Sequence, residues 1–170
     1  MIRTLLAGCA LAGVVVALTT GCNAMSAASA SSPNATTQKE ADLYQIDQIE
    51  RIFHKAGSTH DVNLMMTLFA PGAVFNVGSQ TLTGKAQIRK FFATENPAFQ
   101  PQNHWVSETP SYKIKETVHG DKGTLYFECH YVDVRTGKLA LLIGVNHDVQ
   151  KIDGKWLIVD SSSATPILSP

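Results

Sequence analysis

TLYFECHYVDVRTGKLALLIGVNHDVQKIDGKWLIVDSS, residues 124–162, is the stretch that decides the fold. Apolar and polar side chains alternate along most of it, and an alternation with a period of two is typical of β-strands that bury one face. The segment RTGK at 135–138 and the pair Asp153-Gly154 each predict a hairpin turn. The stretch therefore predicts an antiparallel meander with strands over 124–134, 139–150 and 156–162.

Two helices are predicted well ahead of this meander, where apolar residues recur at three- and four-residue steps. The first runs over 39–56, and Gly57 is placed to end it. The second is short, with Thr59 or Asp61 as its N-terminal cap and Pro71-Gly72 as its end.

Further elements lie between the second helix and the meander. We predict a strand over 73–77, a turn over 78–81 and a third helix over 84–93 that Thr83 caps. A strand over 104–118 is interrupted at Pro110, where we expect a bulge or bend. Helices followed by an antiparallel meander indicate the α+β class. The sheet must curl around the first helix to bury both, which predicts a cone with a pocket between helix and sheet.

The N-terminus carries an export signal. A positive start at Arg3 precedes an uncharged apolar run over 5–18, which is shorter than the roughly 20 residues of a membrane span. The run ends at Gly21-Cys22 and resembles a bacterial lipoprotein box, whose Cys receives a diacylglycerol and becomes the new N-terminus. A second box-like match ends at Cys9, and the alternative to lipidation is simple secretion with cleavage after Ala30.

We therefore expect four parts along the chain: a signal peptide over 1–21, a lipidated Cys22 with a flexible tether over 22–38, one domain over 39–165 and a tail over 166–170. The lipid would hold the protein at the cell membrane or the outer membrane. Without it the chain would be secreted.

Charge and cysteine content exclude several classes of function. The sequence has 14 basic and 14 acidic residues, and this balance argues against nucleic acid as a partner. Export processing leaves Cys129 without a disulfide partner. The six histidines form no compact metal-ligand pattern, and neither a phosphate-binding glycine loop nor a nucleophile elbow occurs, so we predict no metal and no cofactor.

Three motifs resemble those of the nuclear transport factor 2-like superfamily and its SnoaL-like domains. They are LFAPGAVF at 68–75, TGKAQI at 83–88 with Phe91-Phe92 behind it, and DGKW at 153–156. The resemblance implies three N-terminal helices packed on a curved antiparallel sheet, a cone-shaped, cystatin-like roll. The superfamily includes ketosteroid isomerase, cyclases and dehydratases, together with members that lack catalysis, so the fold does not settle the function.

The residues that line the pocket can be predicted by counting strand pairs outward from the hairpin turn. A two-residue turn at Thr136-Gly137 would pair Cys129 with Gly144 and Phe127 with Asn146. A register slip of one residue would exchange the faces of one strand. The predicted pocket face carries the following residues: Phe127, Cys129, Tyr131, Gly144, Asn146 and Asp148.

Matching the DGKW turn to ketosteroid isomerase implies three further positions. The base of that enzyme falls on Val77, its oxyanion-hole tyrosine on Phe53 and its oxyanion-hole carboxyl on Asn146. Since Val77 cannot accept a proton, the resemblance does not extend to steroid isomerisation, and we expect no such activity.

Other polar residues are candidates for catalysis. Asp148 is the candidate general base, Asn146 the candidate oxyanion donor and His104 a candidate at the pocket mouth, with Ser161 joining from the last strand. The alternative is that Asp148 is a solvated carboxylate at a strand end. Tyr131 and Cys129 are also interpreted as core residues rather than as an acid and a nucleophile.

Three functions remain open at this point: binding of a small apolar molecule, acid–base catalysis on a cyclic or lipid-like substrate, and protein interaction in an envelope complex. The same counting of strand pairs places an apolar row on the outer face of the sheet, with Val145 and Val149 among its members. Because a monomer rarely exposes a large apolar patch, we predict a homodimer through this face.

Overall fold

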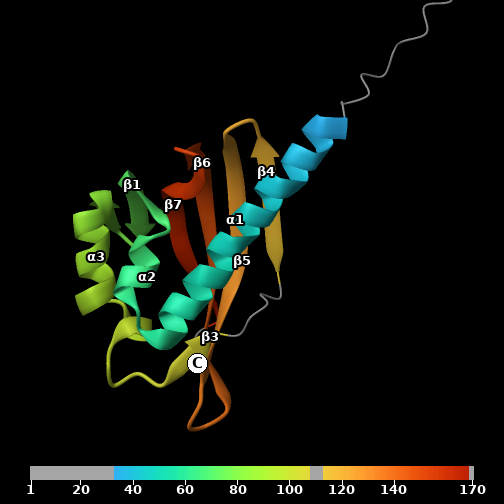
Figure 1. Ribbon diagram of the computed structural model, residues 1–170. Helices are drawn as coiled ribbons and strands as arrows, with labels where there is room; N and C mark the ends of the chain where they lie inside the picture. Colours follow the sequence, from blue (N-terminus) through green and yellow to red (C-terminus); the bar gives the residue numbers. More distant parts are fainter. Residues whose placement is uncertain (1–32, 108–112, 169–170) are drawn as a thin grey trace, which may run out of the picture. The chain divides into compact units, whose positions relative to one another are not determined.

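The computed structural model describes residues 33–107 and 113–168 (Figure 1). The chain divides into two units, 1–30 and 31–170, and all described residues belong to the second. The signal peptide, Cys22 and Pro110 therefore lie outside the described residues. Within these residues, no helix has the length and apolar character needed to cross a membrane.

The first helix, α1 (Pro33–Thr59), is longer at both ends than predicted. It takes up the last part of the predicted tether and continues past Gly57 to a different end. His60 adopts φ 55° and donates its N–H to the Gly57 carbonyl, while the Asp61 N–H bonds to the Ala56 carbonyl. This pair of bonds is the Schellman motif, and His60 occupies the left-handed position that usually holds Gly.

The second helix, α2 (Val62–Met66), begins as predicted and ends earlier. The Asp61 side chain caps it by accepting the Leu64 N–H at 2.9 Å. The assignment of Pro71-Gly72 as its end is wrong, because both residues lie inside the following strand. Pairing of that strand with its parallel neighbour is irregular between Phe69 and Val74, which accommodates a proline that has no N–H.

The sheet has seven strands in the order β2-β1-β7-β6-β5-β3, and β4 also pairs with β5. The β1–β7 pair is parallel and the others are antiparallel. The strand predicted over 104–118 is therefore two short strands, β3 and β4, which both pair with β5. Strand β2 lies where a turn over 78–81 was predicted. The strands are β1 (Phe69–Val77), β2 (Gln80–Thr83), β3 (Trp105–Ser107), β4 (Ile114–His119), β5 (Lys122–Asp133), β6 (Lys138–Ile152) and β7 (Lys155–Leu168).

Helix α1 lies across the inner face of this sheet and contacts β3, β4, β5 and β7 (Figure 1). Near its start, Asp42 accepts hydrogen bonds from Lys151 Nζ at 2.7 Å and Trp156 Nε1 at 3.0 Å. Farther along, Ile46 packs over Gly123, where a Cβ atom would collide with the Thr117 carbonyl oxygen. The missing side chain is therefore required by the backbone of the neighbouring strand β4, and it also leaves room for Ile46, whose Cδ1 would lie 3.2 Å from such a Cβ atom.

Aromatic side chains fill the space between helices and sheet. All seven phenylalanines are buried. Their rings meet mostly edge-on or tilted, with centroids 5.0–6.3 Å apart, which is the favourable geometry for aromatic pairs. Helix α3 (Gly84–Thr94) and the 3₁₀ turn η1 (Pro97–Phe99) contribute three of these rings.

The predicted register between β5 and β6 is wrong by one residue. The last pair before the turn is Asp133 with Lys138. Val132 then pairs with Leu139 and Tyr131 with Leu141, so Ala140 is an extra, bulged residue on β6. The Asp133 carboxylate accepts the N–H groups of Arg135 and Thr136 and so starts the turn earlier than assumed. As a result every β6 side chain beyond the bulge changes face.

The exchange of faces reverses the assignment of the inner and outer residues of β6. Cys129 pairs with Ile143 and Phe127 with Val145, so Val145 and Val149 lie in the core. By contrast the β6–β7 turn was predicted correctly: Ile152 pairs with Lys155, and Asp153 and Gly154 both have positive φ.

Candidate functional site

The structure does not bring together the three residues predicted to be catalytic. Asn146 and Asp148 are exposed on the outer face of β6, where Asp148 pairs with Asp160 on β7. His104 is exposed in the loop before β3. Asp148 and His104 line separate surface hollows. The predicted inward orientation of Asn146 and Asp148 is wrong because it depended on the misassigned register.

The other predicted pocket residues divide into two groups. Gly144 is buried, but it is paired with Glu128, which faces the outer side of the sheet. Val77 is half-buried at the end of β1. The second group is buried in the interior: Phe53, Phe127, Cys129, Tyr131 and Ser161.

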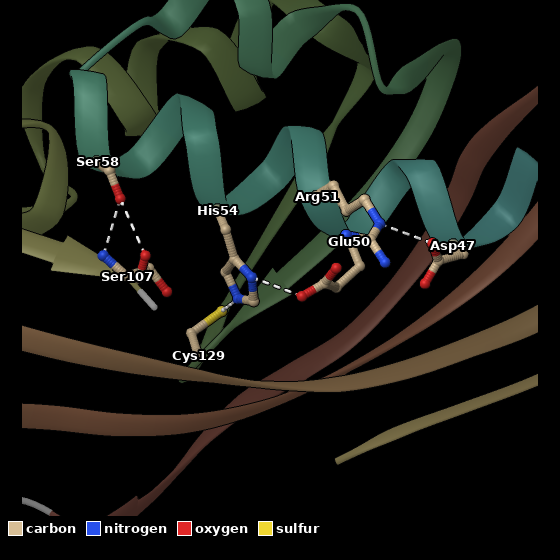
Figure 2. A network of polar contacts seen from close by, with 7 residues as sticks. All are labelled: Asp47, Glu50, Arg51, His54, Ser58, Ser107 and Cys129. Atoms are coloured by element: carbon tan, nitrogen blue, oxygen red, sulfur yellow. Dashed lines mark hydrogen bonds and ion pairs between the residues drawn. The ribbon is translucent and has the colours of Figure 1, made fainter. Parts of the chain in front are cut away.

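A chain of buried polar groups crosses from α1 to β5, and sequence reasoning missed most of it. His54 Nδ1 lies 2.7 Å from Glu50 Oε1, and His54 Nε2 lies 3.3 Å from the Cys129 Sγ (Figure 2). The three residues are at most 1 % exposed. The signal was available, since Glu50 and His54 follow the inward Ile46 at four-residue steps and therefore share its face.

The imidazole of His54 connects the other two groups. Its Nδ1 faces the Glu50 carboxylate and its Nε2 lies within hydrogen-bond distance of the Cys129 Sγ, and which of these atoms donates depends on the protonation state of the ring. Burial raises the pKa of the Cys129 thiol, which therefore stays protonated at neutral pH. A buried, protonated thiol is a poor nucleophile, in agreement with the interpretation of Cys129 as a core residue.

A second polar pair lies on the inner face of the sheet, at the place where the predicted register would put Asn146 or Asp148. His147 on β6 and Ser161 on β7 are directly opposite each other, at 2 % and 0 % exposure. Within the described part of the chain, both imidazole nitrogens and the serine Oγ have no hydrogen-bond partner. Most buried polar atoms in folded proteins have such a partner.

Aromatic rings surround this pair. The His147 ring lies 5.8 Å from the ring of Phe53 and 5.4 Å from that of Phe127. The register pairs Ser161 with Phe75. Burial lowers the pKa of His147 to about 3, so its imidazole is neutral at physiological pH.

The outer face of the sheet is polar, contrary to the prediction of an apolar patch. Glu128 accepts a hydrogen bond from the Tyr126 hydroxyl at 3.0 Å and contacts Lys113 and His130 at 3.2 and 3.3 Å. On β7, Trp156 and Ile158 are buried in the core and add nothing to an outer apolar row. The apolar argument for a dimer through this face is therefore lost.

Across residues 33–107 and 113–168, no three His, Cys, Asp or Glu side chains are arranged to hold a metal ion.

A family model identifies the family of the chain, and solved structures show its fold. The family model described as a SnoaL-like domain matches residues 49–157. A comparison with curated proteins finds no match.

Solved structures of similar fold come from several bacteria. A Nostoc punctiforme protein of unknown function with a cystatin-like fold is 20 % identical, with a TM-score of 0.65 over 75 % of this chain and 94 % of that one. A nuclear transport factor 2-like protein from Novosphingobium aromaticivorans is 14 % identical, with a TM-score of 0.68 over 79 % and 87 %. A Streptomyces avermitilis protein of the same family, provisionally assigned as a dehydratase, is 15 % identical, with a TM-score of 0.59 over 76 % and 99 %.

Proposed function

Because the chain belongs to the SnoaL-like domain family, we propose that it is an exported, lipid-anchored domain that binds a small apolar molecule between α1 and the sheet. The observation that carries this proposal is the unpartnered pair of His147 and Ser161 inside an aromatic interior. Each unsatisfied buried polar group costs about 1–3 kcal/mol. A small, mostly apolar molecule that carries one polar group would hydrogen-bond to these atoms and offset that cost.

Entry of a ligand requires the interior to open, because phenylalanine rings occupy the space around His147. The rings of Phe91 and Phe92 belong to α3, which contacts the sheet mainly through β1 and β2. Separation of α3 from β1 would expose Phe75 and the neighbouring Ser161. The ligand then takes the place of ring contacts, which favours a small apolar molecule.

Anchoring rests on the N-terminal sequence. The uncharged run over 5–18 followed by Gly21-Cys22 supports export and lipidation of Cys22. A tethered binding domain of this kind would hold its ligand at the surface of the membrane.

Titration of the ¹⁵N-labelled chain with toluene, cyclohexanone and indole tests binding. We expect at least one of these molecules to shift the amide resonances of His147, Ser161 and Phe53 in a saturable manner. The exposed-face variant Asp148→Asn is the matched control and should bind equally well. Shifts confined to the outer face of β6, or none at all, would contradict the proposal.

A second candidate function is acid–base catalysis, and the Glu50–His54 pair favours it. A carboxylate that orients a histidine is the arrangement of a general base, and both groups face the interior. The provisional dehydratase among proteins of similar fold is consistent with such chemistry in this fold.

Proton exchange at a model substrate tests this alternative. If the pair is catalytic, the chain in D₂O will exchange the α-protons of cyclohexanone faster than buffer does, and Glu50→Gln will abolish the excess. Exchange at the buffer rate, from a chain that binds cyclohexanone, would exclude this role for the pair.

A further inference from the structure

We infer that the ligand of this interior site is an uncharged cyclic molecule whose single hydroxyl group hydrogen-bonds to His147 and Ser161. The inference rests on the proposed binding function and names the chemistry of the ligand. It follows from the hydrogen-bonding capacity, the charge and the shape of the surroundings of these two side chains.

Hydrogen-bonding capacity selects a hydroxyl group. A neutral imidazole offers one N–H donor and one acceptor nitrogen, and a serine hydroxyl both donates and accepts. In the described residues none of these atoms is engaged, and the two side chains are opposite each other on β6 and β7. One ligand hydroxyl can donate to one of them and accept from the other. A hydrocarbon would leave all of these atoms unsatisfied, and a carbonyl could only accept.

Charge excludes ionic ligands. With a pKa of about 3, His147 is neutral at pH 7 and cannot act as a counter-ion for a carboxylate. Its immediate surroundings are the rings of Phe53 and Phe127. A ligand anion or cation placed among them would lose its hydration without gaining an opposite charge, which is strongly unfavourable.

Shape favours a ring. The rings of Phe53 and Phe127 are tilted by 46° and 44° to the ring of His147, and Phe75 is beside Ser161 in the register. Flat six-membered rings stack or meet edge-on with such neighbours at centroid separations of about 4.5–7 Å. A phenol or a cyclic alcohol combines this shape with the required hydroxyl.

Three benzene derivatives separate these properties: phenol carries the hydroxyl, toluene replaces it with a methyl group, and benzoate replaces it with a charge. Their dissociation constants for the purified chain at pH 7 are measured by calorimetry or NMR titration. We expect phenol to bind about tenfold or more tightly than toluene, since one additional satisfied hydrogen bond is worth about a factor of ten. Benzoate should not bind.

Variants of the two side chains show whether the preference arises at this site. Ser161→Ala is a small change in a buried strand position and should reduce the preference for phenol over toluene several-fold, and His147→Phe should abolish it. Ser162→Ala, at the exposed neighbouring position, is the control and should leave the preference unchanged.

The outcomes are distinguishable. Toluene or benzoate binding as tightly as phenol, or a preference for phenol that survives both substitutions, would overturn the inference while leaving the binding function intact. A crystal structure in which an ordered water bridges His147 and Ser161 and phenol does not displace it would also overturn it. Failure of all three probes, together with failure of the earlier panel, would instead remove the proposed function itself.

Discussion

Glu50, His54 and Cys129 form a continuous polar chain inside a core that is otherwise aromatic and aliphatic. Buried ionisable groups are costly to desolvate, and their mutual contacts only partly offset that cost. Removing one member should lower the free energy of unfolding more than removing both, because a single removal leaves a buried polar group without a partner.

The first prediction follows from that difference. Glu50→Leu should lower the free energy of unfolding by about 2 kcal/mol, because His54 Nδ1 loses its partner in the core. The double variant Glu50→Leu/His54→Leu should lose less than the single variant. Urea unfolding at pH 7 measures both.

Asp47→Leu is the control for this comparison, because Asp47 pairs with Arg51 on the exposed side of the same helix, and it should change stability by less than about 1 kcal/mol. If the double variant loses as much stability as the Glu50→Leu and His54→Leu single variants lose together, the polar chain contributes net stability.

The second prediction concerns pH and His147. Its folded-state pKa of about 3 lies below the ordinary value of 6.5, so between these values the unfolded chain binds more protons than the folded one. Stability should therefore fall as pH decreases below 6.5, with a slope from this residue approaching about 1.4 kcal/mol per pH unit.

Unfolding free energies at pH 7, 6 and 5 test the prediction. His147→Leu should make the dependence shallower, whereas substitution of the exposed His119 by Leu should not. Identical slopes for His147→Leu and the unmodified chain would mean that His147 titrates normally in the folded state.

At the scale of elements, helix ends and hairpin turns determine which side chains face inward. Helix α1 passes Gly57 and ends in a Schellman motif that places His60 at φ 55°. The β5–β6 hairpin starts its turn at Asp133 and adds a bulge, which directs His147 inward and Asp148 outward. Both features are local in the chain, but their effect extends along whole strands and helix faces.

The third prediction uses the end of α1. A non-glycine residue in the left-handed region costs roughly 1 kcal/mol relative to Gly. His60→Gly should therefore raise the free energy of unfolding by about that amount, as measured by thermal or urea unfolding.

His119→Gly is the matched control, because His119 lies in β4, where glycine weakens a strand, and that variant should be less stable than the unmodified chain. A loss of stability on His60→Gly would mean that the His60 side chain contributes more than its backbone strain costs.

At the scale of the whole molecule, two proposals depend on parts of the chain or partners outside the described residues. The proposed membrane attachment depends on Cys22, and the predicted dimer depends on a second copy of the chain. Val145→Glu would not test a dimer, because Val145 is in the core and a buried carboxylate without a partner would destabilise the domain. Dimerisation stays a prediction, which size-exclusion chromatography with light scattering can examine directly.

The fourth prediction concerns the anchor. Cys22→Ser should move the protein from the membrane fraction to the soluble exported fraction and abolish incorporation of labelled palmitate. Cys9→Ser, in the second box-like match, should leave both unchanged. A Cys22→Ser protein that stays acylated and membrane-bound would contradict the assignment.

The sequence alone determined the α+β class, the cystatin-like roll and the Asp153-Gly154 turn, and it limited the cap of the second helix to Thr59 or Asp61. These features arise from side-chain periodicity and from residues with narrow backbone preferences, and both are local properties of the chain. The family resemblance belongs with them, since it is carried by short motifs in a fixed order.

Only the tertiary structure decided the site. One extra residue at the β5–β6 bulge exchanged the candidate Asn146 and Asp148 for His147, and no local pattern in the strand distinguishes the two registers. The contact of His54 with Cys129 joins residues 75 positions apart in sequence. Contacts between such distant residues depend on how helix and sheet pack together, which is why the fold could be predicted from the sequence and the site could not.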